Sequence, residues 1–225
     1  MKYYAIIVGG GTGSRMQSDI PKPFLLLNGK PVIMYTIEAF YNSDLHPEII
    51  IVLNVDFHQY WEDLCKLHNF NLPHTLVKAG RQRFFSVKNG LKFAKGSSII
   101  AIHDAVRPLI SNNLITSAFK EAGNKGSAIP AIAATDSVRQ KSGNSSFVLN
   151  RNDILFVQTP QAFTNKILEK AYKQNFRLEF TDDASVVEKS GVSLNLIKGE
   201  TKNIKITYPE DLIIAQVYLK EKNPH

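Results

Sequence analysis

The chain has 225 residues, of which 44% are apolar and 21% charged, a composition typical of one globular domain with a full hydrophobic core. Its net charge of +7 comes from basic residues scattered among acids, which argues against a nucleic acid partner and favours small anionic substrates. The single cysteine excludes an internal disulfide and a cysteine-rich zinc site. The sequence has no apolar run near ~20 residues and no signal-peptide pattern, so we expect a cytoplasmic protein with no membrane contact.

The first predicted strand, Tyr4–Val8, leads into a glycine-rich loop, Gly9-Gly10-Gly11-Thr12-Gly13-Ser14-Arg15-Met16. Glycines turn tightly and let successive backbone N–H groups face an anion. A dinucleotide fingerprint would need glycine at position 14 or 16, and a Walker loop would need a lysine directly after the glycines. Neither of these two phosphate-binding patterns fits the loop.

A third kind of loop remains, in which the glycine backbone approaches a triphosphate and a base. Two cations, Arg15 and Lys22 of Pro21-Lys22-Pro23-Phe24, would then supply the charge that the lysine of a Walker loop supplies. Taken alone, the loop fits an ordinary turn with both cations in solvent about equally well. The rest of the chain has to decide between the two interpretations.

Strand and helix patterns alternate after the loop. In the first half we predict a helix from near Pro31 to Phe40, a strand over Ile49–Leu53, a helix over Phe57–Leu67, a strand over Thr75–Val77, a helix over Phe84–Ala94 and a strand over Ser98–His103. In the second half we predict a helix over Leu114–Ala122, which Gly123 ends, and a strand over Ser127–Ile132. Two helices over Lys166–Tyr172 and Asp182–Lys189 and two strands over Leu194–Ile197 and Ile204–Thr207 follow. A capping box at Thr207-Tyr208-Pro209-Glu210 opens the last predicted helix. This alternation predicts an α/β fold with a Rossmann-like, doubly wound, mostly parallel sheet in a single domain over residues 1–225.

The pattern changes between residues 134 and 154. Two polar, alternating segments flank a turn at Lys141-Ser142-Gly143-Asn144-Ser145, which predicts a projecting β-hairpin arm. A ribbon of two strands is only marginally stable alone in water. We therefore expect the arm to pack against a second subunit in a homodimer.

Residues just after the predicted strands are the candidates for a site, because ligands of open α/β sheets bind beyond the carboxyl ends of the strands. Asp104 follows the strand Ser98–His103 and is suited to Mg²⁺, which proteins bind with one or two carboxylates plus substrate phosphates. The alternative is an aspartate that caps a turn or pairs with Arg107. His103 has no nucleophile elbow or second histidine at metal-ligand spacing beside it, so we assign it no catalytic role.

Three further segments carry polar residues at element ends. Gly80 and Ser86 lie where a loop becomes a helix, which is also how an ordinary helix start would look. Lys205 lies in an otherwise apolar strand, and an inward lysine there needs an anion, whereas an outward one would not. Thr181-Asp182-Asp183 fits a helix N-cap with acids in the first turn, and this is the favoured interpretation of Asp183.

Together these segments resemble the 2-C-methyl-D-erythritol 4-phosphate cytidylyltransferase family, and the resemblance covers nearly the whole chain. The matching pieces, in order, are Gly10 to Met16, Pro21-Lys22, Gly80 through Arg83 to Ser86-Val87, His103 to Pro108, Thr159-Pro160-Gln161, Thr181 to Ser185, and Asn203 to Leu212. The resemblance implies an enzyme that transfers a cytidylyl group from CTP to 2-C-methyl-D-erythritol 4-phosphate and releases pyrophosphate, in non-mevalonate isoprenoid synthesis.

The residues indicate why such a reaction needs no general base. A phosphate monoester has its second pKa near ~6, so the attacking group is already an anion at neutral pH. The difficulty is to bring two anions together, and in-line positioning with charge neutralisation meets it.

The resemblance also implies roles for particular residues. Arg15 and Lys22 resemble the cations that stabilise the α-phosphate and the departing pyrophosphate, and Asp104 resembles the Mg²⁺ ligand. The CTP contacts would be Gly9, Gly10, Gly11, Gly80, Ser86, Asp104 and Ala105. The acceptor phosphate would be held by Lys205 and by Arg151 of a partner's arm in an arm-exchanged homodimer, and the remaining acceptor wall would consist of Arg107, Ser137, Thr159, Thr181 and Asp182.

Some positions depart from the family pattern. Alanine is frequent where Gly9 stands and glutamine where Pro23 stands, an acid commonly occupies the place of Lys202, and Arg81 replaces an acidic or small residue at the edge of the base pocket. The nearest alternative function is a ribitol-5-phosphate cytidylyltransferase. A sugar-1-phosphate transferase that uses another nucleotide, and a non-enzymatic nucleotide- or RNA-binding module, are the more distant alternatives.

Overall fold

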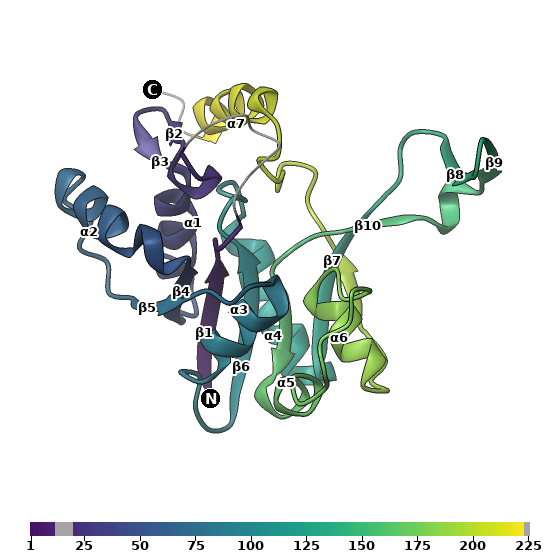
Figure 1. Cartoon of the computed structure of the whole chain (residues 1–225), viewed down its shortest axis with the longest axis horizontal. Helices are drawn as coiled ribbons and strands as arrows, with labels where there is room; N and C mark the ends of the chain where they lie inside the picture. Colours follow the sequence, from purple (N-terminus) through teal and green to yellow (C-terminus); the bar gives the residue numbers. More distant parts are fainter. Residues whose placement is uncertain (12–19, 223–225) are drawn as a thin grey trace.

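An eight-stranded sheet forms the centre of the molecule (Figure 1), whose computed structural model describes residues 1–11 and 20–222. Seven strands lie in the order β10-β7-β11-β6-β1-β4-β5, and β12 pairs with β7. The strands are β1 (Lys2–Val8), β4 (Glu48–Leu53), β5 (Thr75–Lys78), β6 (Ser98–Asp104), β7 (Ser127–Ala133), β10 (Leu155–Val157), β11 (Gln161–Thr164) and β12 (Leu196–Lys198). β1, β4, β5 and β6 run parallel, whereas β11 is antiparallel to β6 and β7, and β10 to β7.

The central strands are buried on both faces, which explains their continuous apolar sequences. Every residue of β6 is buried, and β1 lies between β4 and β6. Successive side chains of β1 alternate between two cores: Ala5 and Ile7 belong to one cluster, and Tyr4 and Ile6 to the other. The sheet therefore needs helices on both of its sides.

Helices cover both faces of the sheet (Figure 1). The first core contains side chains of α1 (Val32–Tyr41), α2 (His58–Leu67) and α4 (Asn112–Lys125). The second contains side chains of α3 (Arg83–Leu91), α5 (Asn165–Ala171) and α6 (Asp183–Lys189). A third, smaller cluster joins α7 (Pro209–Lys222) to the small sheet of β2 (Leu26–Leu27) and β3 (Lys30–Pro31). The predicted α/β, Rossmann-like fold with a mostly parallel sheet is confirmed.

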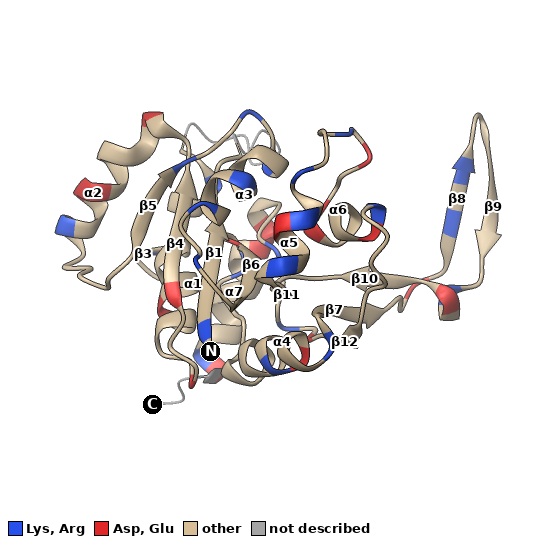
Figure 2. Ribbon diagram, turned by 90° about the horizontal axis from the view of Figure 1, so that it is seen from below, with Lys and Arg blue, Asp and Glu red and all other residues tan. Residues whose placement is uncertain are grey.

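The predicted hairpin arm is present. β8 (Val138–Ser142) and β9 (Ser145–Leu149) form a separate antiparallel ribbon that stands away from the main sheet (Figure 1). Gly143 in its turn has φ +56°, a conformation that favours glycine. Much of the β8 ribbon has the colour of Lys and Arg residues (Figure 2), and Phe147 and Val148 on β9 are exposed. The chain returns to the sheet through the short 3₁₀ helix η4 (Arg151–Asp153) and then β10.

Three details of the sequence prediction were wrong. Residues 204–207 form no strand: they cross the strand ends, and the Ile206 backbone N–H donates to the Val106 carbonyl oxygen at 2.9 Å. Gly123 lies within α4, and the helix ends instead at Gly126, whose φ of +88° lets it adopt the left-handed cap. At the start of α7 the Asp211 carboxylate, rather than that of Glu210, accepts from the backbone N–H groups of Thr207 and Tyr208.

The short strands β10 and β11 were not predicted from the sequence. Each has only three or four residues, too few for a clear period of hydrophobicity. No helix within residues 1–11 and 20–222 is long and apolar enough to cross a bilayer.

Candidate active site

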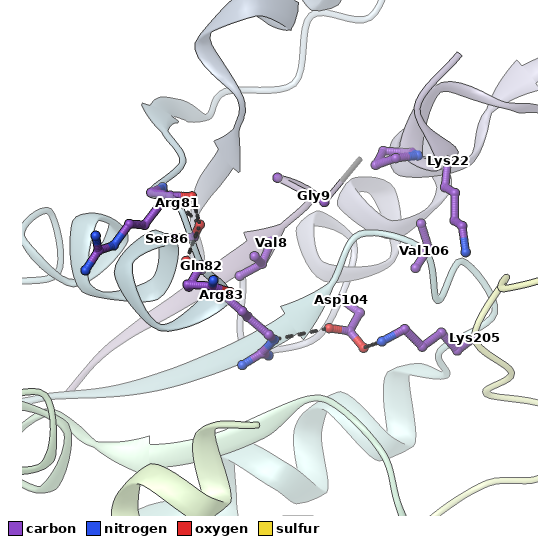
Figure 3. A pocket seen from close by; sticks show the side chains of 14 residues that line it. Val8, Gly9, Lys22, Arg81, Gln82, Arg83, Ser86, Asp104, Val106 and Lys205 are labelled. Atoms are coloured by element: carbon purple, nitrogen blue, oxygen red, sulfur yellow. Dashed lines mark hydrogen bonds and ion pairs between the residues drawn. The ribbon is translucent and has the colours of Figure 1, made fainter. Parts of the chain in front are cut away.

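A cavity of about 390 Å³ opens at the carboxyl ends of β1 and β6 (Figure 3). Its walls come from the end of β1, the 3₁₀ helix η2 (Lys22–Phe24), the loop between β5 and α3, the end of β6 and the segment before α7. The lining residues are Val8, Gly9, Gly10, Gly11, Lys22, Pro23, Gly80, Arg81, Gln82, Arg83, Ser86, Asp104, Val106 and Lys205. This is the place where an open α/β sheet is expected to bind a ligand.

The glycine wall of the cavity is closely packed from behind. A Cβ on Gly10 would lie 2.6 Å from the Cβ of Ala79, and a Cβ on Gly80 would lie 2.3 Å from the Cβ of Phe85. The Gly80 N–H donates to the Ser86 hydroxyl oxygen at 3.0 Å, and that hydroxyl donates to the Gln82 carbonyl at 3.1 Å. Ser86 therefore fixes the loop where it becomes α3, and glycine is required for the loop to lie so close to its neighbours.

Asp104 is the one acidic residue among the described residues that line the cavity, and it is only 7% exposed. Its Oδ2 lies 3.0 Å from Lys205 Nζ and 3.5 Å from Arg107 Nε, and its Oδ1 lies 3.7 Å from Arg83 Nε. Burial acts to raise the pKa of this carboxyl, but Lys205, Arg83 and Arg107 outweigh it and hold the pKa well below the usual range. Asp104 is therefore ionised, and Arg83 and Lys205 reach it from opposite sides (Figure 3).

The two lysines lie on the same side of the cavity. Lys22 begins η2 and its Nζ donates to the Thr207 carbonyl oxygen at 2.8 Å. Lys205 lies only two residues before Thr207, in the same segment, and its side chain is 46% exposed. Phe24 anchors η2 by packing its ring against Phe57, Tyr60 and Trp61. Lys205 meets an anion of the protein itself, Asp104, and the backbone there is not a strand as predicted; its predicted contact with an acceptor phosphate stays a prediction.

Behind Asp104 lies a buried hydrogen-bond network. The Thr159 hydroxyl accepts from the Asp104 backbone N–H at 3.1 Å and donates to His103 Nδ1 at 3.1 Å, while His103 Nε2 donates to the Arg107 carbonyl oxygen at 3.2 Å. Burial lowers the pKa of His103 to about 3, so the ring is neutral. Arg107 donates to the Asn203 carbonyl oxygen at 2.7 Å, and Asn203 donates to that of Thr159 at 2.8 Å. His103, Thr159 and Arg107 support Asp104 from behind and do not line the cavity.

Arg83 was not among the site residues predicted individually. It is the first residue of α3, it lines the cavity, and its terminal nitrogen lies 2.7 Å from Oδ2 of Asp183. Asp183 lies in the first turn of α6, as the sequence predicted, but its complete burial and its pairing with Arg83 were not predicted. The pairing depends on the packing of α6 against α3, which no local sequence signal reveals. Arg83 lies in one of the segments that carry the family resemblance, but no signal in the sequence assigned a site role to Arg83 rather than to Arg81.

The remaining predicted residues lie elsewhere. Ala105 is fully buried beneath Gly9, and Arg15 falls outside the described residues. Ser137 and Arg151 are exposed at the base of the arm, where Arg151 donates to the Thr135 carbonyl oxygen at 3.0 Å.

At the other end of the predicted acceptor wall, Thr181 is exposed, and Asp182 caps α6 through the Ser185 N–H at 2.8 Å and accepts from Gln161 Nε2 at 2.7 Å. The N-cap interpretation of Asp182 is therefore confirmed. Within one chain, the structure brings together these predicted residues: Gly9, Gly10, Gly11, Lys22, Gly80, Ser86, Asp104 and Lys205.

Comparison with known proteins identifies the family. The family model for 2-C-methyl-D-erythritol 4-phosphate cytidylyltransferase matches residues 3–221. The chain belongs to this family. The nucleotidyltransferase prediction is thereby confirmed, and the family is favoured over the ribitol-5-phosphate alternative.

Relatives and solved structures agree with that family. The chain is 46% identical over 219 residues to the 2-C-methyl-D-erythritol 4-phosphate cytidylyltransferase of Phocaeicola vulgatus, a match that covers 97% of this chain and 100% of the relative. It is 45% identical over 215 residues to the enzyme of the same name from Bacteroides fragilis, a match that covers 96% of this chain and 98% of that relative. The solved 4-diphosphocytidyl-2C-methyl-D-erythritol synthase of Anaerococcus prevotii superposes with a TM-score of 0.82 at 27% identity, covering 97% of this chain and 96% of that one.

The buried neutral His103 makes stability depend on pH. Its folded pKa is near 3, whereas the unfolded value is 6.5, so below pH 6.5 the unfolded state binds a proton that the folded state does not. The contribution of the neutral ring to the free energy of unfolding is complete above pH 6.5 and is lost as the pH falls towards 3, at about 1.4 kcal/mol per pH unit.

Chemical denaturation between pH 7 and pH 5 should show that the free energy of unfolding depends less steeply on pH for His103→Gln than for the parent. The exposed His46 provides the control variant His46→Gln. Parallel profiles of His103→Gln and the parent would contradict the neutral, buried histidine.

Proposed function

We propose that this chain transfers the cytidylyl group of CTP to 2-C-methyl-D-erythritol 4-phosphate and releases pyrophosphate, as the resident activity of a cytoplasmic enzyme. The observation that carries the proposal is the cavity that joins the glycine loop to Asp104, Lys22 and Lys205, in a chain that matches this family over residues 3–221. A polyol phosphate and a triphosphate are both anions, and among the described residues four cationic side chains line one small cavity: Lys22, Arg81, Arg83 and Lys205. Such a cavity suits chemistry between two anions.

The reaction forms one phosphorus–oxygen bond and breaks another. An oxygen of the acceptor phosphate attacks the α-phosphorus of CTP, and the bond from the α-phosphorus to the bridging oxygen of pyrophosphate breaks. Because the acceptor phosphate is already anionic at neutral pH, no side chain has to remove a proton. This agrees with the neutral His103, which is buried and engaged behind Asp104. Positioning and charge neutralisation are then the tasks of the chain.

We assign these tasks to particular cations. Lys22, whose ammonium reaches the Thr207 carbonyl oxygen across the cavity wall, would stabilise charge on the α-phosphate and the leaving pyrophosphate together with Arg15. Lys205, half exposed beside Asp104, would hold the acceptor phosphate. The glycine backbone over Gly9, Gly10 and Gly11 and the rim formed by Gly80 and Ser86 would receive CTP, with the Gly9 N–H itself already donated to the Val52 carbonyl oxygen at 2.9 Å.

Asp104 is the residue that would hold Mg²⁺. It is ionised and lines the cavity, and within the described parts of the chain no cluster of three or more histidines, cysteines or acids could hold a metal ion without help. That donor set fits Mg²⁺, which takes one or two carboxylates and completes its shell with phosphate oxygens and water. When bound, the ion would neutralise negative charge on the triphosphate.

We further propose a homodimer in which the arm reaches the partner's site. The ribbon of β8 and β9 stands away from its own sheet, and its Phe147 and Val148 are exposed. β10, at the base of the arm, exposes three consecutive apolar side chains over Leu155–Val157. Apolar surface of this kind is typical of a site covered by another protein surface. Arg151 and Ser137 at the arm base would then complete the acceptor site of the other subunit.

The function is tested by supplying the purified protein with CTP, Mg²⁺ and either 2-C-methyl-D-erythritol 4-phosphate or ribitol 5-phosphate, and measuring pyrophosphate release. We expect release with the methylerythritol phosphate. Turnover with ribitol phosphate alone would show that ribitol 5-phosphate is the acceptor. CTP binding without turnover of either acceptor would show that the protein is a nucleotide-binding module and not this enzyme. Replacing CTP by other nucleoside triphosphates tests the base.

Removing the Lys22 ammonium tests its catalytic role. Loss of one preorganised charge donor at the reacting centre typically lowers kcat by on the order of 10²–10³-fold. We expect Lys22→Ala to show this fall while its melting temperature stays close to that of the parent. Lys66→Ala, on the exposed surface of α2, is the matched lysine control and should keep full activity. A Lys22→Ala enzyme with near-normal turnover would remove Lys22 from the mechanism.

Mixing two inactive variants tests the shared site. Arg151→Ala lacks the arm cation and Lys22→Ala lacks the cavity cation, so each homodimer is impaired. In a hybrid dimer, one site would combine a native Lys22 with a native Arg151 from the other chain. If subunits pair at random, about a quarter of all sites recover in a 1:1 mixture. The recovery is measured as pyrophosphate release after co-refolding. A mixture no more active than its components would contradict a site shared between two subunits.

A further inference from the structure

The guanidinium of Arg83 stands between two carboxylates of different character. Its Nε is 3.7 Å from Oδ1 of Asp104, which lines the cavity, and its terminal nitrogen is 2.7 Å from Oδ2 of Asp183, which does not. Arg83 thus reaches from the cavity wall into the protein interior. One side of its guanidinium meets Asp104 within the cavity (Figure 3), and the other is held from behind.

The rear partner is itself fixed. Asp183 has no exposed surface, and its Oδ1 accepts a hydrogen bond of 2.6 Å from the Tyr172 hydroxyl of the segment that ends α5. Burial raises the pKa of Tyr172 well above its ordinary range, and Asp183 adds to the effect, so the hydroxyl keeps its proton and remains a donor. Burial acts to lower the pKa of Arg83, but Asp183 and Asp104 outweigh it and raise that pKa. Separating a buried pair leaves an uncompensated charge, so this pair is persistent.

Lys205 differs from Arg83 in this respect. The Lys205 side chain is 46% exposed, against 27% for Arg83, and its ammonium approaches Asp104 from the segment before α7. A lysine on a flexible four-carbon stem reorients readily. In the proposed reaction Lys205 turns to the acceptor phosphate, and Asp104 then needs a counter-charge that stays in place.

We propose that Arg83 is a positioning residue, held by Asp183 and Tyr172, that keeps the Asp104 carboxylate directed into the cavity when Lys205 turns to the acceptor phosphate. This inference rests on the proposed function, because it assigns Asp104 to Mg²⁺ and Lys205 to the acceptor. Arg83 does not touch substrate in this role and acts through Asp104. The same contacts connect the cavity to the start of α6, which Thr181 and Asp182 immediately precede.

The experiment separates this role from a structural one by measuring CTP affinity in the presence and absence of Mg²⁺ with isothermal titration calorimetry. Asp183→Asn keeps the shape of the side chain but removes the charge that holds Arg83. We expect it to weaken CTP binding five- to tenfold with Mg²⁺ and less than twofold without Mg²⁺, because Asp104 takes part in CTP binding only when Mg²⁺ is present. Tyr172→Phe removes one hydroxyl and should show the same pattern at two- to threefold. If Asp183→Asn does not fold, Tyr172→Phe decides.

Two controls complete the design. In an Asp104→Asn background, adding Asp183→Asn should change CTP affinity by less than twofold, because the residue through which Arg83 acts is gone. Glu179→Gln removes an exposed carboxylate that pairs with Lys189 of α6 at 3.1 Å, and it should bind CTP like the parent under both conditions. Equal weakening with and without Mg²⁺, or a full additional loss in the Asp104→Asn background, would overturn the inference. Failure of the proposed function is distinct, because the unaltered protein would then not turn over CTP with the methylerythritol phosphate.

Discussion

The charge of one carboxylate organises this molecule. Asp104 ends β6, a strand buried along its whole length, so its charge lies where water is scarce and must be balanced by the protein. Lys205, Arg83 and Arg107 supply that balance from three different parts of the chain. The same requirement fixes where the segment before α7 crosses the strand ends, because Lys205 belongs to it. Electrostatics and topology thereby gather cations at the cavity in which we propose that the triphosphate binds.

How far the sequence predicts this arrangement depends on how local each signal is. β1, β4 and β6 were predicted because a strand buried on both faces needs a continuous apolar run, which stands out in the sequence. The glycine loop and Asp104 were located because each comes at the end of such a strand, and Lys22 was located through the Pro21-Lys22 motif. Their joint position in one cavity then follows from the parallel register of β1 and β6, in which Val8 is opposite Asp104.

Other features depend on contacts between distant segments, and the sequence did not reveal them. An apolar alternation such as Ile204 to Thr207 suits a strand and an unpaired extended segment equally, and only the position of neighbouring strands decides. Asp183 looked like any acid in the first turn of a helix, and its partner Arg83 is a hundred positions earlier in the chain. Arg151 and Ser137 lie on the arm, remote from the cavity of their own chain, so their predicted roles depend on a second subunit rather than on this fold.

The hydrogen bonds of Ser86 have a consequence for the cost of binding. Its hydroxyl accepts from the Gly80 N–H and donates to the Gln82 carbonyl, which closes a small ring of backbone at the rim of the cavity. The conformational entropy of this rim is therefore lost when the chain folds and not when a ligand arrives. In the proposed function, the base of CTP would meet a preorganised surface here and would retain more of its contact energy as affinity.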